Sequence, residues 1–259
     1  MGRQRRTLRR RNALAMTDTE LDWAALSDRL AASLHLPTPP IGIAFSEEPP
    51  AGVLPFDAPM SAPGPDGRRG RVPAGCVFWV RAAASTFSTV PEDHGNCSVG
   101  RVTHGLASLE EVAGNDDVAA LLASGWVSED AVRGVPAVGG RPGAITYGPL
   151  RDTPAGVRPD VVLLRVNGRQ LMVLSDALPS MRIEGKPQCH VVALAKEHRV
   201  AAASVGCALS RARTGMTPEE MTCALPAGEL AETVAAVERA SEVDSGVARY
   251  AATDSRRFS

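Results

Sequence analysis

Several features are scarce or missing in this chain of 259 residues. Aromatic residues make up only 4% of it, so the core has to be built mainly from valine, leucine and alanine. No apolar stretch approaches the roughly 20 residues that a membrane-spanning helix needs. The formal net charge is −1, whereas a nucleic-acid-binding domain is normally basic. We therefore expect no membrane and no nucleic acid as partner.

The N-terminal segment lacks the pattern of an export signal. Six arginines lie between Arg3 and Arg11. An apolar segment of about 7–15 residues would follow them in a secretory signal, but polar and acidic residues follow instead. We therefore expect a cytoplasmic protein, in which cysteines stay reduced and structural disulfides are rare.

The same segment sets the expected domain organisation. Residues 1–16 are interpreted as a disordered basic arm, or as a stretch preceding a true start at Met16. Hydrophobic residues make up 44% of the chain, enough for a packed globular fold. We expect one globular domain over residues 17–259, with possible halves at 17–150 and 151–259.

Common catalytic and nucleotide-binding motifs are also missing. No Gly-x-Ser-x-Gly elbow occurs, so serine hydrolase chemistry has no support. The glycine-rich segment Gly134–Gly143 matches neither a phosphate-binding loop nor a dinucleotide fingerprint, and we interpret it as a flexible loop.

Four of the five cysteines form two similar pairs. Cys76 and Cys97 are 21 positions apart, and Cys189 and Cys207 are 18 apart. In each pair a cysteine is followed by a short apolar run, then by a turn or strand, and then by a second cysteine that follows a glycine or asparagine. Two such half-sites supply the four thiolates that an iron–sulfur cluster or a structural zinc ion requires.

The hydrophobic pattern predicts alternating helices and strands. Strands are expected at 41–45 and 159–166, and helices opening at the cysteines are expected over 76–84 and 190–196. An amphipathic helix is expected over 227–240, followed by a polar tail. The order predicts an α/β or mixed α+β fold, with two loosely related halves around a shared cysteine site.

Three kinds of cysteine site remain open at this stage. A four-iron [4Fe–4S] cluster is favoured, because the ligands would come singly from distant segments and no tight Cys-x₂₋₄-Cys knuckle is present. A zinc-stapled binding or accessory protein is the first alternative. A thiol-based redox enzyme is the second, with Cys76 or Cys189 activated at a helix N-terminus. Cys223 lies outside the pairs and is interpreted as buried or incidental.

Nearby basic residues are candidates for handling substrate. His94, His104 and His190 are candidates for a general acid or base or an alternative ligand, and His94 is ranked above His104 because it lies three residues before Cys97. Arg211 and Arg213 follow Cys207 and could pair with a carboxylate or phosphate, or with a nearby glutamate. The favoured interpretation is an iron–sulfur enzyme with redox or Lewis-acid chemistry on a small anionic molecule, or with an electron-transfer partner; its catalytic residues are predicted to be His94 and Arg211.

A family resemblance supports the framework without giving a reaction. The segments that carry it are Leu36–Phe45, Cys76, Cys97, Pro159–Leu163, Cys189, Gly206–Arg211, Glu219-Glu220 and Leu225-Pro226. In their order along the chain these segments resemble the prokaryotic family known as domain of unknown function 169, from about residue 20 to residue 258. The resemblance implies that the four matching cysteines share a metal or cluster site.

Overall fold

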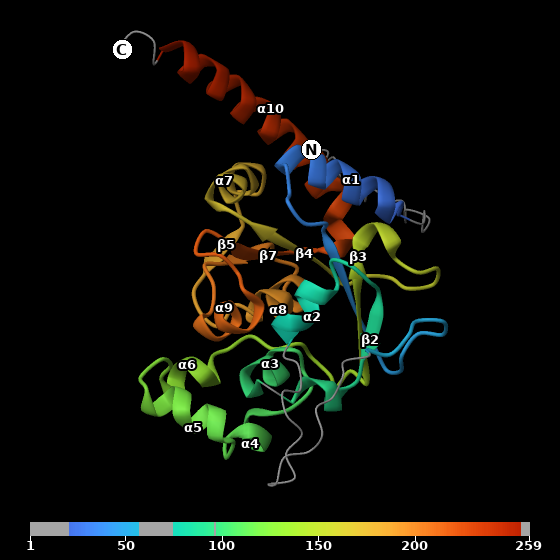
Figure 1. Cartoon of the computed structure of the whole chain (residues 1–259), viewed down its shortest axis with the longest axis vertical. Coiled ribbons are helices and arrows are strands. Elements are labelled where there is room, and N and C mark those ends of the chain that lie inside the picture. Colours follow the sequence, from blue (N-terminus) through green and yellow to red (C-terminus); the bar gives the residue numbers. More distant parts are fainter. Residues whose placement is uncertain (1–20, 57–74, 96, 255–259) are drawn as a thin grey trace, which may run out of the picture.

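The computed structural model describes residues 21–56, 75–95 and 97–254, and a seven-stranded mixed sheet lies at its centre (Figure 1). The strand order is β2-β3-β1-β4-β7-β6-β5. The strands are β1 Ile41–Ser46, β2 Phe87–Thr89, β3 Ala144–Pro149, β4 Val161–Val166, β5 Arg182–Glu184, β6 Ala202–Ser204 and β7 Met221–Pro226. The fold is therefore mixed α+β, as the sequence predicted.

The two expected halves of the chain contribute separate ends of this sheet. The strands β2, β3 and β1 come from residues 17–150, and the other four come from residues 151–259. The halves meet where β1 pairs antiparallel with β4, with Ile43 opposite Val161. All strand pairs are antiparallel except β5 with β6, which are parallel.

Alternation along the central strands divides the buried side chains between two faces. In β4, Val161 and Leu163 point into one core, while Val162 and Leu164 point into the other. This is the period-two pattern of a strand buried on both sides. The unbroken apolar run that predicted the strand follows from this two-sided burial.

Different helices cover the two faces. The first face packs against α1 (Trp23–Leu34), α7 (Gly168–Ala177) and α10 (Leu230–Asp254). The second face packs against α2 (Gly75–Arg81) and α8 (His190–Glu197). The first core is almost purely aliphatic, whereas the second contains most of the aromatic rings.

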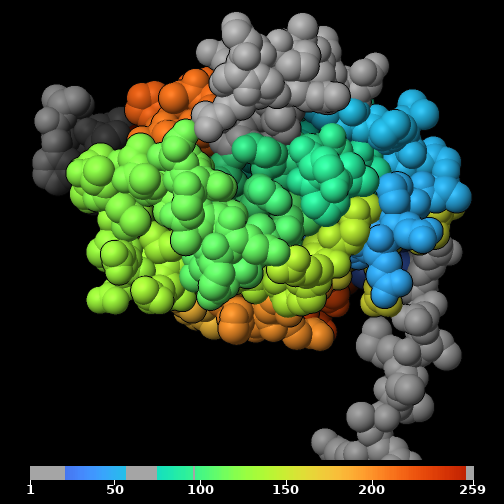
Figure 2. All heavy atoms as spheres, turned by 90° about the horizontal axis from the view of Figure 1, so that it is seen from below, coloured from blue at the N-terminus to red at the C-terminus, as the bar shows by residue number. Residues whose placement is uncertain are grey.

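A group of short helices extends the second face. They are α3 Ser98–Thr103, α4 Leu109–Val112, α5 Asp116–Ala123, α6 Glu129–Arg133 and α9 Ala208–Thr214. Short 3₁₀ turns lie at Pro91–His94, Leu150–Asp152 and Ala227–Glu229. Helices α4, α5 and α6 gather at the end of the molecule opposite to the end of α10 (Figure 1), and in Figure 2 they cover much of the visible face.

The main differences from the predicted elements concern helix ends. The helix expected over 227–240 continues as α10 to Asp254, where a polar tail was predicted. The arm at residues 1–16 lies outside the described residues, and Asp22 caps α1 by accepting a hydrogen bond from the amide of Ala25 at 2.9 Å. Among the helices that the structure describes, none has the length and apolarity to cross a bilayer.

Candidate cysteine site

The four paired cysteines line the same small pocket. Cys76, Cys97, Cys189 and Cys207 all contribute to a pocket of about 30 Å³, together with residues of α3, α5 and α9. They come from four segments that are far apart in the sequence. The order of elements is the same in both pairs: helix α2 then strand β2 lead to Cys97, and helix α8 then strand β6 lead to Cys207.

Each of these cysteines lies at the start of a helix. Cys76 is the second residue of α2, and Cys97, Cys189 and Cys207 are the N-cap residues of α3, α8 and α9. The first turn of a helix carries backbone N–H groups without partners inside the helix. The amide of Gly100 donates to the Cys97 sulfur at 3.4 Å, which shows how such a group meets a sulfur here.

Polar side chains complete the wall of the pocket. The Gln188 side-chain amide donates to the Ser210 hydroxyl at 2.6 Å, and Arg213 lines the pocket beside them. The Gln188 side-chain oxygen is buried without a hydrogen-bond partner in the described part of the chain. Trp126 forms part of the apolar wall. Sequence reasoning missed Gln188, Ser210 and Trp126, because none of them belongs to a motif.

Burial raises the pKa of two thiols. For Cys76, burial is the main cause, the nearby Cys97 thiol acts in the same direction, and a hydrogen bond with Ser210 acts against it. Burial also raises the pKa of Cys189, again reinforced by Cys97. Burial thus acts against the activation that was expected at these helix starts, because loss of hydration disfavours a thiolate. This counts against Cys76 or Cys189 as a free thiolate nucleophile.

The thiols are not arranged around a single point. In residues 21–56, 75–95 and 97–254, no three side chains of His, Cys, Asp or Glu are placed to hold one metal ion together. The cysteines thus share a pocket without forming a tetrahedral set. A mononuclear zinc site would require their sulfurs to move closer.

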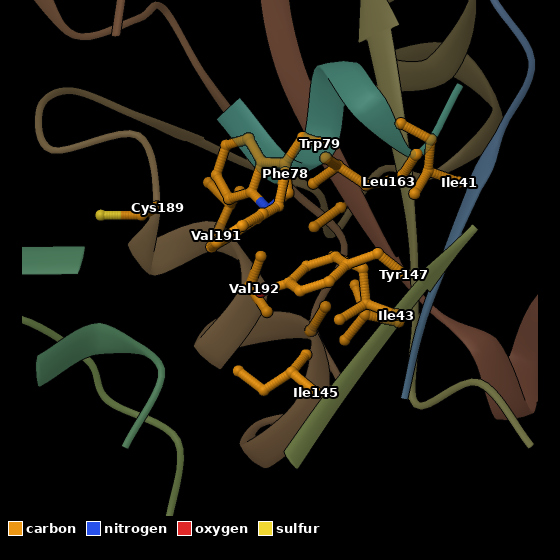
Figure 3. Close-up of a cluster of buried hydrophobic side chains, with 14 of the residues drawn as sticks. Ile41, Ile43, Phe78, Trp79, Ile145, Tyr147, Leu163, Cys189, Val191 and Val192 are labelled. Atoms are coloured by element: carbon orange, nitrogen blue, oxygen red, sulfur yellow. The ribbon is translucent and has the colours of Figure 1, made fainter. Parts of the chain in front are cut away.

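The fifth cysteine provides a contrast within the same chain. Cys223 lies in β7, fully buried in the aliphatic core on the first face of the sheet, where burial raises its pKa to about 12. Figure 3 shows the Cys189 sulfur pointing away from the packed rings of Phe78, Trp79 and Tyr147. Cys223 is therefore a buried residue outside the pocket, as the sequence predicted.

The two histidines near Cys97 are buried in the aromatic core. His94 is 1% exposed, and its Nε2 lies 2.9 Å from the Thr89 hydroxyl. Burial lowers its pKa well below the usual value. His104 is fully buried, and its Nδ1 lies 2.8 Å from the Gly100 carbonyl oxygen. Burial lowers its pKa to about 4. Neither ring lines the cysteine pocket, so the catalytic role of His94 stays a prediction.

Arg211 and Arg213 differ in their surroundings. The Arg211 guanidinium donates to the backbone carbonyls of Val205, Thr217 and Glu220 and holds the loop after α9 in place. It also lies against Gly206, whose φ of +122° suits only glycine. Arg213, not Arg211, lines the pocket with the cysteines. The substrate role proposed for Arg211 stays untested, and its guanidinium is already used for structure.

His190 follows Cys189 directly but faces a different partner. Its Nε2 lies 3.3 Å from a carboxylate oxygen of Glu184 at the end of β5. Burial lowers its pKa, and the glutamate acts in the opposite direction. Like His94 and His104, His190 does not line the pocket.

Comparison with known proteins identifies a family. A profile of DUF169, described as an uncharacterised ArCR family, matches residues 29–236. The chain belongs to the DUF169 family. The match spans all four pocket cysteines and Arg213, so this DUF169 chain carries its whole candidate site inside the family region. No curated protein and no solved structure matches the chain.

Proposed function

We propose that the four pocket cysteines hold an iron–sulfur cluster, with a [4Fe–4S] cluster favoured, and that the protein is cytoplasmic. The observation that carries the proposal is that four cysteines from four distant segments line one pocket, each at a helix start. The donor set fits the group, because thiolates are the usual ligands of such clusters. A cluster of several irons is favoured over one zinc ion because the ligands come singly from separate segments and no tight Cys-x₂₋₄-Cys knuckle is present.

Cluster binding would require the pocket to widen and the thiols to lose their protons. A pocket of about 30 Å³ has room for about one water molecule, so the lining side chains have to rearrange when the cluster binds. The thiols must also lose their protons, and burial has raised the pKa of Cys76 and Cys189. Metal coordination removes those protons outright, so cluster assembly should release protons.

The same geometry supports a redox or Lewis-acid enzyme acting on a small anionic molecule. A bound cluster would supply an electron or an acidic iron. Arg213 is the basic residue in the pocket wall and is suited to hold a carboxylate or phosphate there. Gln188 and Ser210, hydrogen-bonded to each other, can orient such a group by further hydrogen bonds.

The test is metal analysis after anaerobic purification. We expect a brown protein with broad absorption near about 400 nm and roughly four irons and four sulfides per chain. A colourless protein with one zinc per chain would overturn the cluster and favour the zinc-stapled accessory protein. A metal-free protein in which one of the four cysteines is alkylated much faster than the others would favour the thiol-based redox enzyme.

A further inference from the structure

A cavity lies directly beside the cysteine pocket and is much larger. Its volume is about 440 Å³, and it is partly open to solvent and lined by the short helices α3, α4, α5 and α6 together with the segment before α8. Most of its wall is aliphatic, including Val102, Val112, Val118, Leu122 and Val132. The helices that line it lie next to one another on the face seen in Figure 2.

The cavity exceeds what imperfect packing leaves in a small core. Protein interiors contain few voids larger than a water molecule, whereas ligand pockets commonly measure about 300–1,000 Å³. Four buried residues, Val102, Ala107, Val112 and Val118, form a small core in this region, and three of them also line the cavity. The cavity therefore has the size and lining of a site for a small molecule.

The cavity and the cysteine pocket share a wall. Val99, Leu121 and Pro187 line both spaces. The chain also passes from one space to the other over four residues, because Lys186 lines the cavity while Gln188 and Cys189 line the pocket. A molecule in the cavity would therefore lie within one side-chain layer of the thiols.

Four charged residues line the cavity, and they are not equivalent. Glu129 and Arg133 form an ion pair with each other at 3.8 Å. Glu110 is held by hydrogen bonds that lower its pKa, first from its own backbone amide and second from the Ser108 side chain. The ammonium of Lys186 lies over the Trp126 ring, 4.6 Å from its centre. The ion pairs formed between described residues do not include Lys186. Lys186 is thus the cation at the wall that is available for a ligand.

We propose that this cavity binds an apolar small molecule that carries one carboxylate. The apolar body fills the aliphatic space, and the carboxylate pairs with Lys186 on the side nearest to the cysteine pocket. Burial of an apolar chain gives the affinity, and the ion pair fixes the orientation. Binding itself does not depend on a cluster, but the role of the cavity as the substrate chamber rests on the proposed function.

The test uses the whole chain and a fluorescent apolar anion, anilinonaphthalene sulfonate. Octanoate should displace this dye more strongly than octanol or octylamine of the same chain length, because only octanoate complements Lys186. Lys186→Ala should weaken octanoate by up to about fivefold and leave octanol unchanged, since Lys186 is exposed and an exposed ion pair contributes up to about 1 kcal/mol. Leu122→Trp fills the cavity and should abolish displacement by both.

The chain offers a matched control for Lys186. It contains only two lysines, and the second, Lys196, also has its ammonium over an aromatic ring, 5.5 Å from the centre of Phe45. Lys196 does not line the cavity, so Lys196→Ala should leave octanoate binding unchanged. Circular dichroism shows whether each variant is folded. If Leu122→Trp does not fold, the comparison of Lys186→Ala with the parent decides the test.

Several results would overturn the proposal. They are no dye displacement by octanoate, equal octanoate binding in Lys186→Ala and the parent, or octylamine binding as tightly as octanoate. Iron and sulfide are measured on the same preparations to separate the two proposals. Octanoate binding to a chain that never acquires a cluster would contradict the proposed function alone. A loaded chain without octanoate binding would contradict the cavity alone.

Discussion

The two faces of the central sheet are built from different materials. The face under α1, α7 and α10 is closed by long helices and aliphatic side chains. The face under α2 and α8 contains Phe78, Trp79, Tyr147 and two histidines, and short helices with the cysteine pocket lie beyond it.

Buried polar atoms without hydrogen-bond partners also distinguish the two faces. On the second face, the Trp79 and Tyr147 side chains and one ring nitrogen each of His94 and His104 are buried without a hydrogen-bond partner among the described residues. Unsatisfied buried polar atoms are costly and are uncommon without a functional reason. The second face therefore carries a stability cost from these atoms, and the proposed cysteine site lies beyond that face.

The sharpest test of this comparison exchanges one buried cysteine on each face for alanine. Cys189→Ala should lower the iron bound per chain by at least about tenfold, because loss of even a supporting group around a metal ligand commonly costs ten- to hundredfold. Cys223→Ala should keep its iron and lose about 1 kcal/mol of unfolding free energy through a small new cavity. Iron analysis and urea unfolding provide the two measurements. Equal iron in both variants would remove the distinction between the faces.

A second test concerns the neutral histidine of the second face. His104 has a pKa of about 4 in the folded chain, below its ordinary value of 6.5, because it is buried. Between these values the unfolded chain binds a proton that the native chain does not, so stability falls as the pH drops from 6.5 to 4 and levels off below that. The loss from this one ring is of the order of 3 kcal/mol.

The measurement is urea unfolding of chelator-treated protein between pH 4 and pH 7. His104→Gln should flatten the decline in this window, whereas His198→Gln, an exposed histidine at the end of α8, serves as the surface control. An undiminished decline in His104→Gln would show that the ring is accessible to protons in the native state.

The strands of the sheet were predictable to different degrees. β4 was readable because both of its faces are buried, which makes Val161–Val166 a continuous apolar run. β7 was missed, because Met221–Pro226 contains threonine, cysteine and a terminal proline. It forms a strand because it pairs with β4 on one side and β6 on the other, and that pairing is tertiary information.

The candidate site was predictable in its ligands but not in its polar wall. The repeated cysteine pattern gave the four residues that line the pocket, because all four lie at predicted helix starts or beside a glycine or asparagine. Arg211 and Arg213 are two residues apart, so they point to different sides of α9, and no sequence pattern distinguishes the one that faces the pocket. His94 is close to Cys97 in the chain, but the 3₁₀ turn at Pro91–His94 places its ring against Phe78 in the core.

The smallest effect of a substitution is expected in the outer part of α10, which extends beyond the first face of the sheet. Only the first half of α10 packs on the sheet; beyond it Val243, Val247 and Tyr250 are 60–67% exposed, and the helix extends away from the body (Figure 1).

Gly246 lies in this outer part, and an added Cβ would meet only the end of Arg249 at 3.9 Å. Alanine stabilises a helix interior by about 1 kcal/mol relative to glycine. Gly246→Ala should therefore slow hydrogen exchange of the amides at 241–254 by up to about fivefold, while the packed amides at 230–240 stay as they are. Unchanged exchange at 241–254 would show that the outer part of α10 is not helical in solution, and the polar tail predicted from the sequence would then describe it better.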